Sequence, residues 1–404
     1  MLTLQRYRDL FDVPRLRATL IASMLGRLPI GIAGLAILLL VQRQSGSFEA
    51  AGTASALYVL GLAAVAPFLG RLMDTLGPRP VLLACTVLYP AAMVAIAALA
   101  LESASAAAIS SMALVAGATL PPISACTRAL YPRLIAEPSL LHTAYSVDSA
   151  LIEIVFVLGP ALVAACVALD HPEAAVLLAA LAALCGGLMF VATPAIRSWT
   201  RAGARTHGSW LGVLASPRLL IVYSATVLYS VAFGLFEVAV SAHAAARGAP
   251  AAAGIALALA SLGSGVGALV YGSRHWRTPL TAQFALALAL MCGGYLLLVP
   301  VEGLALYAIV CIIAGVPMAT VIAVQSLLIA RYAVRERLAE GFTWGATCLL
   351  AGISSGIALG GALAERVQPY WLLVAAALAT LAALGVVIVG LGEDARPAAG
   401  ERTG

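Results

Sequence analysis

The stretch GRLMDTLGPR, residues 70–79, separates two apolar runs near 52–71 and 80–101, and this pattern decides the fold. Each run is about as long as the roughly 20 helical residues needed to cross the hydrocarbon core of a bilayer. Gly77-Pro78 forces a turn that a continuous helix cannot carry. The stretch therefore predicts two transmembrane helices joined by a short polar loop.

The same alternation of apolar run and short polar connection extends over the rest of the chain. Hydrophobic residues make up 62% and charged residues 10% of the 404 residues, against roughly half and a quarter in soluble domains. So few charges do not cover a water-facing surface, and lipid is the solvent that fits. The apolar runs predict about twelve helical spans, near 18–41, 52–71, 80–101, 105–127, 140–168, 173–193, 219–242, 251–272, 279–300, 304–330, 342–364 and 369–392.

The positions of the arginines predict the orientation. All 23 basic residues are arginine, and basic residues accumulate in cytoplasmic loops. With the N-terminus in the cytoplasm, nineteen arginines fall in inside segments, whereas Arg43, Arg247 and Arg366 fall outside. Both termini are then cytoplasmic. Arginine without lysine, with abundant alanine and glycine, indicates a GC-rich bacterial genome, so we expect a multi-pass protein of the bacterial inner membrane.

The longest connection divides the chain into two halves. It is rich in arginine and joins the sixth and seventh predicted spans. We expect an N-terminal six-helix bundle at 1–193, a cytoplasmic linker at 194–218, a C-terminal six-helix bundle at 219–392 and a cytoplasmic tail at 393–404. Two six-helix halves on a cytoplasmic linker are the layout of transporters that rock one half against the other.

Motif, position and layout together resemble the major facilitator superfamily. That family carries glycine, small or apolar residues, Asp, then Gly and a basic residue after the second span, and Gly70, Asp74, Gly77 and Arg79 match this signature. The resemblance covers nearly the whole chain and implies an all-α membrane protein of two six-helix bundles. It implies that these four residues gate the cytoplasmic side, with Asp74 and Arg79 bridging to neighbouring helix ends. Alternatively, Asp74 only caps a helix and Arg79 anchors to lipid headgroups.

The sequence departs from the family pattern in three places. Residues 271–277, YGSRHWR, repeat the basic part of the signature in the second half without its Asp. Many proton-driven exporters of the family carry an arginine inside the fourth span, but Arg128 lies at the cytoplasmic end of that predicted span. Gly159-Pro160 on the fifth span lacks the flanking glycines of such exporters. These departures weaken the antiporter assignment without removing it.

Glycines also recur at every fourth residue of the eleventh predicted span, at Gly352, Gly356 and Gly360. Such a stripe lets another helix approach closely. It suits either a sliding contact between the two halves or ordinary tight packing.

Ionisable residues inside the predicted spans are the strongest pointers to function, because each needs a partner or a role. Arg27 lies in the first span, roughly 14 Å from its cytoplasmic end, and Asp148 and Glu153 lie in the fifth. The two acids are about 140° apart around the helix, so we expect one to face Arg27 and the other the cavity. We expect Glu153, or in second place Asp148, to bind and release a proton. The alternative is a static ion pair that pins two helices together.

The resemblance implies that the first, fourth, seventh and tenth spans line a central cavity. The candidates for contacting substrate are therefore Glu237, Phe233, Tyr229 and Tyr223 on the seventh span and Gln325 on the tenth. Alternatively, Glu237 already lies in the headgroup region. The nearly charge-free cavity helices favour small amphipathic molecules over sugars, phosphates or dicarboxylates.

The sequence gives no support to other chemistries. The seven cysteines fall inside apolar runs without metal-ligand spacing and the histidines lie at span ends or in loops, so we expect no metal site and no cofactor. A phosphate-binding Gly-Lys-Ser/Thr loop and a pair of catalytic groups at depth are both missing from the sequence, so we expect no catalytic residues and no enzyme. The arginines lie in short clusters rather than on one face, which argues against nucleic acid as a partner.

These observations predict a secondary active transporter that exports small amphipathic molecules in exchange for protons, by alternating access. Its partners are then the small-molecule substrate, protons and the lipid bilayer, and we expect a monomer. One alternative is uptake or facilitated diffusion of a small metabolite. Another is a membrane sensor or scaffold that keeps the fold but moves nothing, against which the gating motif and the buried acids argue.

Overall fold

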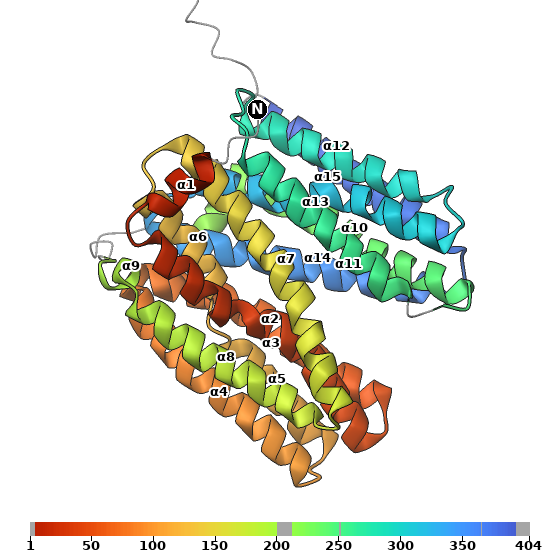
Figure 1. The fold of residues 1–404 in the computed structure, drawn as a ribbon. Helices are drawn as coiled ribbons and strands as arrows, with labels where there is room; N and C mark the ends of the chain where they lie inside the picture. The colour runs from red at the N-terminus through yellow and green to blue at the C-terminus, as the bar shows by residue number, and fades with distance from the viewer. Residues whose placement is uncertain (1–4, 200–211, 250–251, 365, 393–404) are drawn as a thin grey trace, which may run out of the picture.

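The computed structural model describes residues 5–199, 212–249, 252–364 and 366–392, and within these ranges every regular element is helical (Figure 1). Twelve of its helical segments are long and apolar enough to cross a membrane. The prediction of an all-α membrane protein with twelve spans is thereby confirmed. Residues 200–211 of the predicted linker and the whole tail, 393–404, lie outside the described residues.

The N-terminal half begins with a short helix, α1 (Gln5–Asp12), that the sequence analysis did not anticipate. Six spans follow it: α2 (Leu16–Ser45), α3 (Phe48–Leu76), α4 (Pro78–Leu101), α5 (Ala106–Thr119) with α6 (Ile123–Leu134), α7 (Pro138–Ala168) and α8 (Pro172–Ala192). The described parts of the linker hold α9 (Pro194–Arg197) and the single turn η1 (Gly212–Ala215).

The C-terminal half is built in the same way. Its spans are α10 (Pro217–Ala246), α11 (Ala252–Gly272), α12 (Leu280–Leu298), α13 (Leu304–Tyr332), the turn η2 (Arg335–Arg337) leading into α14 (Leu338–Ala364), and α15 (Pro369–Leu391). Helices start sharply because capping residues satisfy their first amides. The Ser47 side chain accepts a hydrogen bond from the Ala50 amide, and Ser216 does the same for Leu219.

The fourth span is broken, which corrects the expectation of one run ending near residue 127. Pro121 and Pro122 lack backbone N–H donors and disfavour helical conformation in the residue before them. α5 therefore ends at Thr119, and α6 begins at Ile123 and continues to Leu134. Placing Arg128 at the cytoplasmic end of the span was wrong, because the helix continues a further six residues beyond it.

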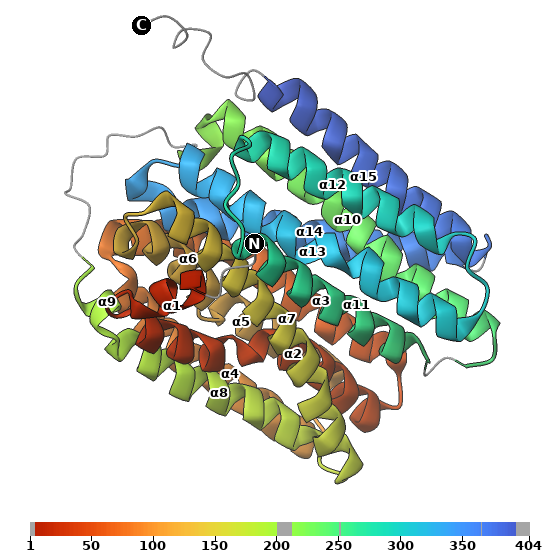
Figure 2. The same cartoon turned by 45° about the horizontal axis from the view of Figure 1, so that its top comes forward.

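The helices gather into two groups, α2–α8 and α10–α15, which lie on opposite sides of the molecule in Figure 2. Within the first group, α2 contacts α8, α7 and α3; within the second, α10 contacts α14 and α15, and α11 contacts α13. Between the groups, α3 lies against α14, and α7 lies against α11 and α13. Side chains on these five helices therefore lie where the two groups meet.

The glycine stripe of α14 faces its own half. A Cβ on Gly356 would lie 2.2 Å from the carbonyl oxygen of Val231 in α10, and a Cβ on Gly360 would meet Val238 of the same helix at 2.9 Å. Of the two interpretations of this stripe, the contacts support tight packing within the C-terminal half rather than a sliding contact between halves.

Candidate functional site

A buried ion pair joins the first and fifth spans. Arg27 Nη2 lies 2.7 Å from Asp148 Oδ1, and both side chains are 0% exposed. Arg27 follows the start of α2 by eleven residues and Asp148 follows the start of α7 by ten, which places each about 15 Å along its helix. The two side chains meet because these helices start at the same end of the bundle and contact each other. Of the two acids that the sequence left open, Asp148 is the partner of Arg27.

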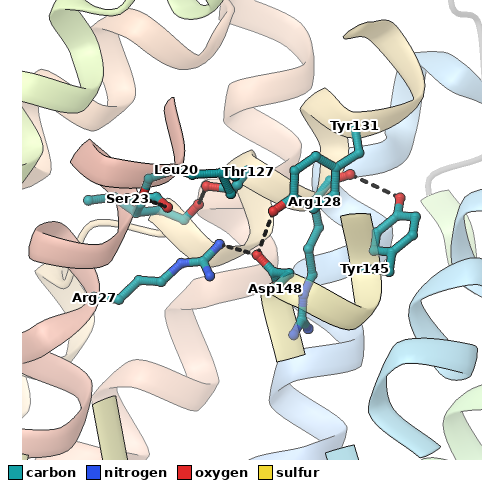
Figure 3. Close-up of polar contacts among 9 residues, drawn as sticks. Leu20, Ser23, Arg27, Thr127, Arg128, Tyr131, Tyr145 and Asp148 are labelled. Carbon is teal, nitrogen blue, oxygen red and sulfur yellow. Dashed lines mark hydrogen bonds and ion pairs between the residues drawn. The ribbon is translucent and has the colours of Figure 1, made fainter. Parts of the chain in front are cut away.

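Two residues of α6 complete the surroundings of Asp148 (Figure 3). Arg128 Nε lies 2.7 Å from Asp148 Oδ2, and the Tyr131 hydroxyl donates to Oδ1 over 2.8 Å. The sequence analysis missed both residues because it ended the fourth span before them. The available signal was Pro121-Pro122, since a helix that restarts after this break continues past Arg128 and includes Tyr131.

Aromatic rings cover this cluster and connect it to the other half. Tyr145 of α7 donates its hydroxyl proton to the backbone oxygen of Arg128 over 3.0 Å. Its ring meets that of Tyr131 edge-on at a centroid distance of 5.2 Å, and that of Phe342 in α14 at 5.9 Å. The charged cluster therefore lies directly behind the contact between α7 and the C-terminal half.

Glu153 faces the C-terminal half instead of the cluster. Ser264 Oγ of α11 donates to Glu153 Oε1 over 2.7 Å, and the Ala319 amide of α13 donates to Ser264 Oγ over 2.9 Å. An amide nitrogen only donates, so the serine hydroxyl accepts from Ala319 and gives its own proton to Glu153. Among the ion pairs of the described residues, none includes Glu153. A hydroxyl, rather than a cation, holds this carboxyl between the halves.

Asp74 also connects the halves, at the ends of α3 and α14. Its Oδ2 accepts a hydrogen bond of 2.8 Å from the Glu340 amide, and its Oδ1 accepts one of 3.2 Å from the Ala339 amide. Both amides belong to the first turn of α14, where the helix dipole favours a negative charge. Asp74 is thus a helix cap, and the helix that it caps belongs to the opposite half.

The other residues of the signature divide between this contact and the surface. A Cβ on Gly70 would lie 2.1 Å from Thr343 Oγ1, so α3 approaches α14 this closely because residue 70 has no side chain. Gly77 has a φ of 85°, in the region that favours glycine, and forms the turn into α4. Arg79 is exposed, and the contacts of the described residues do not join it to Asp74.

Further bonds between the halves lie at the same end of the molecule. Arg6 of α1 donates to the backbone oxygen of Arg274 over 2.7 Å and lies 2.9 Å from His275 Nδ1. Thr143 near the start of α7 donates to the backbone oxygen of Gly272, at the end of α11, over 2.8 Å. Together with Asp74, these bonds close one end of the interface.

The predicted cavity residues of the C-terminal half do not form one group. The Tyr229 hydroxyl donates to Gln325 Oε1, with both side chains buried. Tyr223 is buried too, and its hydroxyl donates to the Gly341 backbone oxygen over 2.9 Å. In this state Tyr223, Tyr229 and Gln325 form hydrogen bonds between helices rather than face an open space.

Glu237 and Phe233 are partly exposed and lie four residues apart on one face of α10. Glu237 precedes the end of its helix by nine residues, which is about 14 Å along the helix axis. The neighbouring Tyr295 hydroxyl is buried without a hydrogen-bond partner. Throughout the described ranges, no three His, Cys, Asp or Glu side chains gather as metal ligands.

Comparison with known proteins agrees with this architecture. A family model described as the Major Facilitator Superfamily matches residues 19–333. A curated relative, the uncharacterized MFS-type transporter y4rN of Sinorhizobium fredii (strain NBRC 101917 / NGR234), is 29% identical over 281 residues, which are 66% of this chain and 68% of the relative.

Two solved structures share the fold. A bacterial homologue of the iron transporter ferroportin in its outward-facing state superposes with a TM-score of 0.78 at 16% identity, covering 94% of this chain and 99% of that one. The human organic anion transporter MFSD10 (TETRAN) superposes with a TM-score of 0.65, also at 16% identity, covering 93% and 98%. Identities this low show a common fold alone.

Proposed function

This chain belongs to the major facilitator superfamily, and from that premise we propose that it exports small amphipathic molecules across the bacterial inner membrane in exchange for protons. The two halves alternate between a state closed to the cytoplasm and one open to it. The arginine-rich ends of the helices face the cytoplasm under this proposal, as the distribution of basic residues favours.

The position of Glu153 carries the proposed proton step. Asp148 accepts hydrogen bonds from two arginines and a tyrosine, which hold it as an anion within its own half. Glu153 instead shares a hydrogen bond with Ser264 of the opposite half. When the halves separate, that bond is lost and the surroundings of the carboxyl change, and with them its preference for a proton. A carboxyl whose environment alternates with the transport cycle is suited to carry protons.

The gate of this proposal is the contact of α3 with α14. The Asp74 cap and the close approach at Gly70 support a state closed to the cytoplasm. Opening that side requires both contacts to break, while Ser264 moves away from Glu153. The gate and the proton site therefore change together, which is the coupling that an antiporter needs.

Proteoliposomes with an imposed pH gradient, screened against a panel of amphipathic compounds, test the proposal. We expect substrate-dependent proton flux from the wild-type protein and none from Glu153→Gln. Ser264→Ala should retain transport with an altered pH dependence, because the carboxyl loses one hydrogen-bond donor from the opposite half. Glu302→Gln is the matched control, since Glu302 is exposed in the loop before α13 and its substitution should leave flux unchanged.

Three outcomes would contradict the proposal in different ways. Undiminished pH-driven transport by Glu153→Gln would rule this residue out as the proton carrier. Substrate movement without proton flux would favour facilitated diffusion or uptake of a metabolite. A fully folded protein that moves no compound under any gradient would favour the sensor or scaffold.

A further inference from the structure

The cluster around Asp148 holds more positive than negative charge. Arg27 and Arg128 each pair with this one carboxylate, and among the described ion pairs neither arginine has a second acid. Arginine stays protonated in proteins, so the three side chains sum to one surplus positive charge. In a bilayer interior such a charge is costly unless a counter-ion meets it.

The cluster also has more donors than acceptors. Arg27 bonds to Asp148 through Nη2, and its Nε and Nη1 are buried without a hydrogen-bond partner. The described contacts of Arg128 use Nε, which leaves both terminal nitrogens of its guanidinium unassigned. Three donors already occupy the carboxylate of Asp148. The missing component is therefore an acceptor with negative charge.

Arg128 is the accessible edge of the cluster. Its side chain is 14% exposed, whereas Arg27 and Asp148 are 0% exposed. In Figure 3 its guanidinium extends past Asp148, on the side away from Arg27. The helix α6 that carries Arg128 contacts α14 of the other half. The free end of Arg128 therefore lies where the two halves meet, in the region that opens and closes during alternating access.

The surroundings of this arginine are aromatic. Tyr131, Tyr145 and Phe342 form a continuous series of ring contacts beside it, with centroid distances of 5.2 Å and 5.9 Å. All three rings are buried in this structure, so under the proposed transport cycle they offer their apolar surfaces to a ligand once α7 and α14 separate. A single spare cation next to aromatic surface matches a molecule with one negative group and an apolar body.

We propose that the transported molecule is an amphipathic monoanion, an aromatic or alkyl carboxylate or sulfonate, whose charged group binds the free end of Arg128. This inference rests on the transporter function proposed above and names its substrate class. The planar guanidinium suits the two oxygens of such a group. One surplus charge fits one anionic group, so a dianion leaves an uncompensated negative charge, and a neutral or cationic molecule leaves the arginine unpaired.

Binding to the full-length protein in nanodiscs of phosphatidylcholine tests this without a pH gradient or transport. The probes are matched sets that differ in one group: phenylbutyrate, phenylbutanamide and phenylbutylamine, with naphthalenesulfonate as a second anion. We expect the two anions to raise Tm progressively with concentration and the amide and the amine not to. Arg128→Gln should weaken the apparent affinity for the anions by about tenfold or more, and Arg128→Lys should retain part of it.

Arg128→Gln is expected to fold, because it leaves Arg27 and Asp148 as a neutral pair. The control variant is Arg43→Gln, whose arginine pairs with Asp170 far from the cluster and should respond as the wild type does. Equal stabilisation by anion and amide, no response to either anion, or an unchanged response in Arg128→Gln would each overturn the proposal. Stabilisation by phosphatidylglycerol nanodiscs, with no effect of the soluble anions, would identify the anion as a lipid headgroup and also overturn it.

Failure of this inference is distinguishable from failure of the proposed function. Anion-selective binding that depends on Arg128, together with absence of proton flux, would support the substrate class and contradict proton exchange. Proton flux driven by neutral or cationic compounds, together with binding that does not depend on Arg128, would support proton exchange and contradict the substrate class.

Discussion

Asp74 of α3 accepts a hydrogen bond of 2.8 Å from the backbone amide of Glu340, in the first turn of α14, so a carboxylate of one half caps a helix of the other. Capping within a single bundle stabilises that bundle in every state. A cap that crosses between bundles stabilises only the state in which they touch. The structure shows Asp74 as a cap, and because this cap joins the two halves it is compatible with the gating role that we propose.

Asp74→Asn should weaken the closed state while leaving both bundles folded. The asparagine keeps an acceptor oxygen but loses the negative charge that interacts with the helix dipole. That interaction is worth about 1 kcal/mol. Its loss should lower the ratio of closed to open protein roughly fivefold. Hydrogen–deuterium exchange at the Ala339 and Glu340 amides measures this directly, and faster exchange is expected. Arg79→Gln serves as the control, and the gating role of Asp74 is wrong if both variants exchange alike.

Gly70→Ala should prevent α3 and α14 from reaching their observed separation. Its Cβ would lie 2.1 Å from Thr343 Oγ1 and 2.8 Å from the Ala339 oxygen, distances that real side chains do not tolerate. Spin-label distances across the ends of α3 and α14 should increase, and adding Thr343→Ala should restore part of the change. Gly52→Ala, at a position with open space around it, should leave the spin-label distances unchanged. A similar increase in that variant would show that the clash at residue 70 is not the cause.

Asp148→Asn should destabilise the protein far more than Arg128→Gln does. Asp148→Asn leaves the buried Arg27 and the partly exposed Arg128 without a carboxylate. Removing the partner of a buried charge costs about 3–5 kcal/mol, whereas Arg128→Gln leaves one matched pair. Thermal unfolding in nanodiscs gives the comparison, with a clearly lower Tm expected for Asp148→Asn. Equal Tm values for the two variants would show that Asp148 does not neutralise both arginines.

The helix α1 should act as a strap on the closed end. Arg6 and Tyr7 of α1 bond to the backbone of α11 and the loop after it, so Arg6→Ala combined with Tyr7→Phe should detach α1 and speed its hydrogen exchange. Burial raises the pKa of Tyr7 above its ordinary value. With a raised pKa the Tyr7 hydroxyl is protonated at neutral pH and can donate its hydrogen bond to α11. The stabilisation of the α1 contact by this bond is lost only as the pH rises through that alkaline pKa. Unchanged protection of α1 in the double variant would show that other contacts hold it.

Several features followed from the order of residues alone. Twelve apolar stretches of bilayer length dictate twelve helices, because lipid offers no partners for unpaired backbone groups. The break at Gly77-Pro78 required only local backbone chemistry. The sequence also placed Arg27, Asp148 and Glu153 inside predicted spans. It marked them as candidates for function because a charge inside a span needs a partner or a role.

The pairing of those charges was decided by tertiary structure. Helical periodicity shows that Asp148 and Glu153 face different directions, but not which helix lies in each direction. Because α7 contacts α2, Asp148 forms an ion pair with Arg27. Because α7 also contacts α11, Glu153 accepts a hydrogen bond from Ser264. Arg128 entered the cluster because α6 restarts after Pro121-Pro122 and turns that side chain towards α7.

The amino-acid sequence thus determined the number of membrane-spanning helices and the turn at Gly77-Pro78, because helix length in lipid and turn formation depend on neighbouring residues. Only the tertiary structure decided that Asp74 caps a helix of the opposite half and that two arginines share one carboxylate. The Asp74–Glu340 and Arg27–Asp148 pairs join residues more than a hundred positions apart. The packing of whole helices, rather than any local preference, brings them within hydrogen-bonding distance.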